Sequence, residues 1–78
     1  MFYVFKNLKT RDVYGNFSKN PLQSIYAHIR RANNPASNRY NTLLRKNLRE
    51  HFNDFTWEIY MNKPDFIEIL RYYGPSKL

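Results

Sequence analysis

The chain has 78 residues, no cysteine and a formal net charge of +7. A chain of this length predicts one small domain, residues 1–78, that buries only ~60–65% of its unfolded surface. The composition excludes disulfides and thiolate metal sites, and no apolar run approaches the ~20 residues of a membrane span. With no signal-peptide pattern after Met1, we expect a cytoplasmic protein that does not enter a membrane.

The positive charge is concentrated in the first two thirds of the chain. Residues 1–49 hold ten lysines and arginines and one acidic residue, Asp12, whereas residues 50–78 hold three basic and five acidic residues. A field of one sign attracts polyanions, of which nucleic acid is the commonest and an acidic protein surface the next. A solvated surface that only keeps a small protein in solution is the alternative interpretation.

Two short strands are predicted at the start of the chain. Residues 2–5 are apolar and β-prone, residues 9–12 form a polar turn, and Val13 and Tyr14 resume the strand pattern before residues 15–16 break it.

A first helix is predicted to begin after Asn20. Asn20 can cap it, Pro21 suits the first helical position, and Gln23 stands where a capping box has its polar partner. Helical spacing then predicts a buried stripe made of Leu22, Ile25, Tyr26 and Ile29.

A second helix is predicted with Ser37 as its cap. Its buried stripe is expected to consist of Tyr40, Leu43, Leu44, Leu48 and either His51 or Phe52.

The last third of the chain predicts a strand and a third helix. Residues 55–61 alternate, so one face is expected to carry Phe55, Trp57, Ile59 and Met61, with Trp57 in the core rather than stacked on a base. Residues 62–64 begin the helix, which ends at Gly74; its apolar side holds Phe66, Ile67, Leu70 and Tyr73. The order β-β-α-α-β-α predicts an α+β fold, a three-stranded antiparallel sheet with about three helices packed on it.

In this order the elements resemble the GIY-YIG nuclease domain. Its first triplet is represented by Phe2-Tyr3-Val4 and its second by a shortened Val13-Tyr14-Gly15. His28 matches the histidine of an Arg-x-x-x-His helix motif, and residues 44–59 resemble the later helix and strand. The family is frequent in phages and mobile elements, so the resemblance implies a small viral protein in the host cytoplasm.

Two positions depart from the family pattern. The resemblance implies an arginine on the first helix that stabilises phosphate charge and a glutamate that holds a divalent metal, but these positions fall at Ser24 and Leu70. A hydroxyl cannot supply guanidinium charge, and leucine cannot bind Mg²⁺. We therefore expect only relic catalytic positions, with no metal and no other cofactor: Tyr3, Tyr14, Ser24, His28 and Leu70. Glu58 and Glu68 are the carboxylates that could restore a metal site. Packing is the alternative role of the tyrosines, as a cross-strand aromatic pair.

The sequence thus predicts a non-catalytic, GIY-YIG-like protein that binds duplex DNA and competes with or blocks an active nuclease at its DNA site. The basic residues expected to contact phosphates are Lys6, Lys9, Arg11, Lys19, Arg30, Arg31, Arg45 and Arg49. One alternative is a small viral inhibitor that binds an acidic host or competitor protein. Another is a metal-dependent endonuclease with displaced ligands. The oligomeric state stays open.

Overall fold

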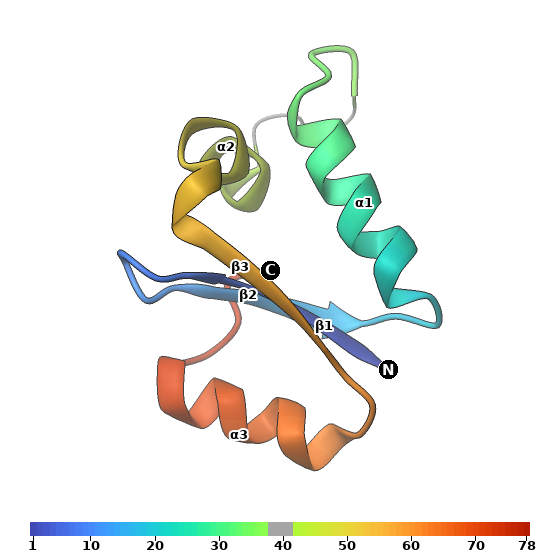
Figure 1. Ribbon diagram of the computed structural model, residues 1–78, viewed down its shortest axis with the longest axis vertical. Coiled ribbons are helices and arrows are strands. Elements are labelled where there is room, and N and C mark those ends of the chain that lie inside the picture. The colour runs from blue at the N-terminus through green and yellow to red at the C-terminus, as the bar shows by residue number, and fades with distance from the viewer. Residues whose placement is uncertain (38–41) are drawn as a thin grey trace.

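Three layers make up the computed structural model, which describes residues 1–37 and 42–78 (Figure 1). The middle layer is an antiparallel sheet in the order β2-β1-β3, whose strands are β1 (Phe2–Asn7), β2 (Val13–Phe17) and β3 (Phe55–Tyr60). Two helices lie on one side of it, α1 (Pro21–Ala32) and α2 (Leu43–Glu50), and α3 (Lys63–Tyr73) lies on the other. A short 3₁₀ turn, η1 (Phe52–Asp54), leads into β3. The predicted α+β fold and its order β-β-α-α-β-α are confirmed.

The central strand β1 pairs along its length with both neighbours. Phe5 lies opposite Tyr14 on β2 and opposite Trp57 on β3. Val4 and Phe5 point to opposite faces and are both 0% exposed, because helices cover β1 from both sides.

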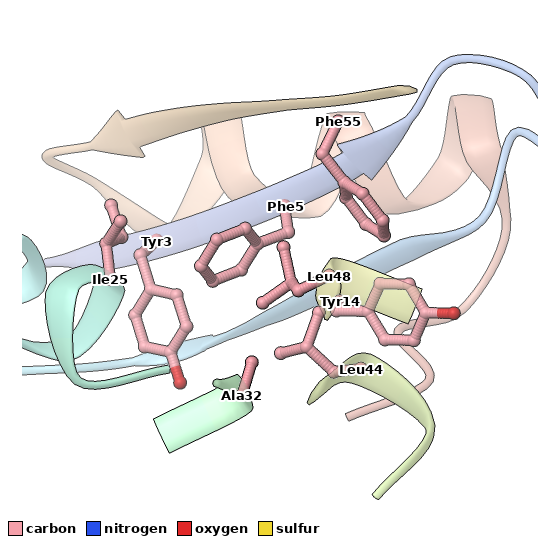
Figure 2. Packing of buried hydrophobic residues seen from close by; sticks show 8 residues of the cluster. All are labelled: Tyr3, Phe5, Tyr14, Ile25, Ala32, Leu44, Leu48 and Phe55. Atoms are coloured by element: carbon pink, nitrogen blue, oxygen red, sulfur yellow. The ribbon is translucent and has the colours of Figure 1, made fainter. Parts of the chain in front are cut away.

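This alternation produces two separate hydrophobic cores. The core beneath α1 and α2, shown in Figure 2, contains Tyr3, Phe5, Tyr14, Ile25, Ala32, Leu44, Leu48 and Phe55. The core beneath α3 contains Val4, Val13 and Phe66, with Phe2, Tyr60, Ile69, Leu70 and Tyr73 packed around them.

The β1–β2 turn is organised by a buried asparagine. The Asn7 side-chain oxygen accepts hydrogen bonds from the backbone N–H groups of Lys9 and Thr10. The turn then closes through Arg11, which has a positive φ of 66°. The strand break predicted at residues 15–16 is wrong, because Gly15 and Asn16 continue their pairing with β1.

The two edges of the sheet differ. Along β2, the Lys77 backbone N–H donates to Val13 O, and Ser76 Oγ bonds both the N–H and the carbonyl of Gly15. The chain end therefore covers the β2 edge. Within residues 1–37 and 42–78, no other segment makes backbone hydrogen bonds along the outer edge of β3.

The cap predicted at Asn20 and the helix start predicted at residues 62–64 are confirmed. Asn20 accepts a hydrogen bond from the Gln23 N–H at the start of α1, and Asn62 accepts one from the Asp65 N–H at the start of α3. The cap predicted at Ser37 is wrong, because α2 begins after Thr42. Tyr40, predicted in the buried stripe of that helix, lies outside the described residues.

Several apolar residues that the sequence predicts to be buried on the side of α1 and α2 are exposed. Leu22 and Tyr26 on α1, Leu43 on α2 and His51 and Phe52 beyond it are exposed. On β3 only Phe55 is buried on the predicted core face, and Trp57, Ile59 and Met61 are exposed. Each helix therefore buries only the part of its apolar stripe that faces the sheet or the other helix, and part of β3 stays uncovered. On α3, likewise, Phe66 is buried but Ile67 is exposed.

We expect Gly15→Ala to destabilise the fold, because an added Cβ would lie 2.8 Å from the ring atom Cε1 of Phe66 and 3.1 Å from Tyr3 O. Overpacking of this kind costs ~1–3 kcal/mol, measurable as a lower midpoint of urea unfolding.

A double-mutant cycle with Phe66→Leu provides the control. If the clash with the ring causes the loss, the two substitutions together cost less than their sum. Strictly additive losses would show that Gly15 is needed for another reason.

Candidate functional site

Tyr3 and His28, two of the positions indicated by the family resemblance, meet on the α1–α2 side of the sheet. The Tyr3 hydroxyl oxygen lies 3.0 Å from His28 Nε2, which is hydrogen-bonding distance. Tyr3 is buried in the first core. Nδ1 of His28 is also buried and has no hydrogen-bond partner among the described residues.

Arg45 approaches the same pair from α2. It is only 7% exposed, unusual for an arginine. Burial, followed by the charges of Arg45 and Arg31, lowers the pKa of His28 to about 4. At neutral pH the imidazole is therefore uncharged, and the positive charge beside Tyr3 belongs to the guanidinium.

These residues border a hollow of about 310 Å³ at the surface. Its lining consists of Asn16, His28, Thr42, Arg45, Lys77 and Leu78. Its described lining includes two cationic side chains, an amide and a hydroxyl, and none of these residues is Asp or Glu. Asp12 lies close by and forms an ion pair with Lys77, with Nζ and Oδ1 3.4 Å apart. The lining suits an anion that accepts several hydrogen bonds.

The side chains at the relic positions Ser24 and Tyr14 make contacts outside this hollow. Ser24 Oγ lies 2.6 Å from Ser18 Oγ, in the region that leads into α1. The Tyr14 hydroxyl accepts a hydrogen bond from Asn47 Nδ2 at 3.1 Å and points in a different direction from that of Tyr3 (Figure 2). The alternative packing role is confirmed for both tyrosines, which are buried in the first core. The direct cross-strand pair is wrong, because Tyr3 lies opposite Asn16 and Tyr14 opposite Phe5.

Neither tyrosine is prepared to act as a base. Burial is the main factor that raises the pKa of Tyr3 and the pKa of Tyr14. Both hydroxyls therefore stay protonated at neutral pH. A general base works best with a pKa near the working pH, so these two positions are poorly matched to that task.

The carboxylates lie on the other side of the sheet. Glu58 bonds Lys6 and Tyr60, and the bond with Lys6 is the main factor that lowers the pKa of Glu58. Leu70 packs in the second core, and Glu68 is exposed on the same helix, α3. Among the described residues no group of three or more His, Cys, Asp or Glu side chains could hold a metal ion.

The predicted phosphate-contacting cations fall into two groups. Lys6 pairs with Glu58, Arg45 is buried, and Arg49 Nη1 donates to Ala32 O at 3.0 Å. The remaining residues are exposed at their positions: Lys9, Arg11, Lys19, Arg30 and Arg31. Arg11 also lies over the rings of Tyr72 and Tyr73.

Sequence reasoning treated Arg45 as a surface cation and did not include Lys77. One signal for Arg45 was present, since it directly follows Leu44 and precedes Leu48 by three residues, next to the buried side of the helix. Nothing in the local sequence indicated that Lys77 would reach the hollow, because the contact depends on how the chain end follows β2.

Comparisons with protein-family models, with curated proteins and with solved structures find no match for this chain. The resemblance to GIY-YIG nucleases therefore stays a prediction from the sequence motifs. No helix among the described residues is long and apolar enough to cross a membrane.

We expect the stability of the fold to decrease between pH 6.5 and about pH 4. His28 has a folded pKa of about 4 against an ordinary value of 6.5. The unfolded chain therefore takes up the proton first, and stability present at neutral pH is lost as the pH falls through this window. Because the ring is only partly buried, we expect a loss of roughly 1–2 kcal/mol from this group.

Urea unfolding at several pH values measures this loss, and an NMR titration of the His28 ring measures its pKa directly. His28→Gln should flatten the pH dependence in this window. An ordinary pKa for His28 in the folded protein would contradict the buried, cation-flanked environment described above.

Proposed function

We propose that this chain is a non-catalytic DNA-binding protein of GIY-YIG type, whose hollow beside Tyr3 and His28 holds a phosphate of the DNA backbone. The observation that carries the proposal is Arg45, a buried guanidinium beside the Tyr3–His28 pair in a hollow whose described lining holds no Asp or Glu side chain. Such a protein would occupy the DNA site of an active nuclease without cutting it.

Arg45 supplies from α2 the guanidinium charge that Ser24 cannot supply from α1. A phosphate is a favourable ligand for this guanidinium because its oxygens match the planar fork of arginine N–H donors. Asn16 and Thr42 offer side-chain donors in the same lining. Together they favour binding of a phosphate ester.

Turnover would need more than this charge. Phosphodiester hydrolysis requires an activated nucleophile and, in this family, a divalent metal. The raised pKa values of Tyr3 and Tyr14 and the position of Glu58 on the opposite face argue against both requirements. We therefore favour binding over cleavage.

Exposed cations outside the hollow would add affinity that is independent of sequence. Arg31 is exposed at the end of α1 and is close enough for its charge to affect His28. Each phosphate neutralised adds ~0.9 to the slope of log affinity against log salt. We expect binding that weakens steeply as salt rises.

Lys77→Gln should weaken binding to a 20-base-pair duplex by about three- to tenfold and lower the salt slope by about 1, since one phosphate contact is lost. Lys77 is exposed, so the substitution should leave the fold intact. Fluorescence anisotropy at several salt concentrations measures both quantities.

Arg71→Gln is the matched control, since Arg71 is exposed on α3 across the sheet. It should change affinity much less than Lys77→Gln. Equal losses for both variants would show that net charge alone drives binding, and absence of binding at low salt would end the proposal. Mg²⁺-dependent plasmid nicking that Tyr14→Phe removes would instead support the endonuclease alternative.

A phosphate in the hollow should also raise the pKa of His28. The charge of Arg45 helps to lower that pKa, and a bound anion would offset this charge. We expect dimethyl phosphate, added while His28 is titrated by NMR, to move its pKa upward, whereas equal ionic strength of sodium chloride should move it less. No difference between the two salts would place the DNA phosphate outside the hollow.

A further inference from the structure

A second surface, distinct from the hollow beside His28, lies between α1 and the free edge of the sheet. It is an apolar groove of about 350 Å³ lined by Leu22, Ile25, Tyr26, Ile29, Phe52 and Trp57. None of the described residues that line it is charged. Tyr26 is 71% exposed and Trp57 is 42% exposed, so large apolar surfaces face the solvent here. Contiguous exposed apolar surface of this kind marks interaction sites.

The groove runs beside the edge of β3 that no described segment pairs. The chain end covers β2, whereas β3 has backbone bonds only with β1 on its inner side. An open edge is a template for an additional strand, and a partner strand would gain main-chain hydrogen bonds there. Its alternate side chains would enter the groove beside Trp57.

The charged residues around the groove indicate which kind of partner it binds. A second copy of this chain would bring together two molecules that each carry +7, which opposes pairing. Arg30 lies four residues beyond Tyr26 on α1 and is exposed, and Lys63 is exposed just beyond β3. Within the described residues neither has a carboxylate partner.

The acidic groups near the groove are few. At its Phe52 end, Glu50 and Asp54 lie near the cation Arg49. Glu58, the charged residue of β3, points to the opposite face and pairs with Lys6. The exposed cations Arg30 and Lys63, together with the net charge of +7, favour an acidic partner over a basic one.

We infer that this groove and the β3 edge bind an extended segment of an acidic protein, with apolar side chains at alternate positions and Asp or Glu between them. The partner strand pairs with β3, its apolar side chains cover Trp57 and Tyr26, and its carboxylates lie near Arg30 and Lys63. This surface does not depend on DNA binding at the hollow.

A defined peptide, acetyl-DVEFDVE-amide, tests the inference against a basic counterpart, acetyl-KVKFKVK-amide. Trp57 is the only tryptophan in the chain, so its fluorescence reports directly on the groove. The acidic peptide should change that fluorescence and shift the NMR signals of residues 55–60, with at least about tenfold tighter binding than the basic peptide. Equal binding of both, or binding of neither at millimolar concentration, would overturn the inference.

Two matched tyrosine variants locate the contact. Tyr26→Ser removes a groove residue, and Tyr72→Ser removes a residue of equal exposure, 70%, on α3. The first should weaken peptide binding at least about fivefold and the second less than about twofold. Equal weakening would overturn the inference. Binding of the acidic peptide should persist in Lys77→Gln, which separates this surface from the proposed DNA site.

Sedimentation equilibrium of the protein alone tests whether a second copy of this chain occupies the groove. A monomer at tens of micromolar is expected. A dimer at that concentration that Tyr26→Ser dissociates would assign the groove to a second copy and overturn the inference.

Discussion

The structure depends on a single constraint, the burial of β1 from both faces in a chain of only 78 residues. Val4 and Phe5 contribute to different cores, so helices must lie on both sides of the sheet. The helices α1 and α2 share one face of the sheet. They cover β1 and β2 but leave part of β3 exposed. The exposed groove at Trp57 and the open strand edge therefore follow from the same layer arrangement that stabilises the fold.

The closure of α2 against α1 also determines the electrostatics of the site. Arg49 donates to Ala32 O at the end of α1, which ties the two helices together close to Arg45. Arg45 is thereby held at low exposure beside Tyr3 and His28, where its charge disfavours protonation of the imidazole. An anion bound beside Arg45 would offset the charge that disfavours protonation of His28, so anion binding and the titration of His28 are coupled.

The sequence predicted those parts of the structure that local chemistry determines. Asn20 with Pro21 and Asn62 with Pro64 located the starts of α1 and α3, because a capping side chain and a proline act within one turn. Helical spacing could not show that Tyr26 stays exposed, because burial of a helix residue depends on which other elements pack against that side of the helix. The resemblance named Tyr3 and His28 as relic positions but not their contact, which the fold creates between β1 and α1. Arg45 and Lys77 likewise reach the hollow through contacts between elements distant in sequence.

The two surfaces use different sides of α1, and this bears on which function the chain performs. His28 faces the cationic hollow, whereas Tyr26 lines the apolar groove, and two residues of a helix that are two positions apart point about 200° away from each other. A ligand at one surface therefore does not obstruct the other. DNA binding and binding of an acidic protein, which the charge of the sequence left as competing interpretations, are sterically compatible in this fold. If the hollow binds a DNA phosphate on one side of α1, the apolar groove on the other side stays available. The chain could then bind DNA and an acidic protein at the same time.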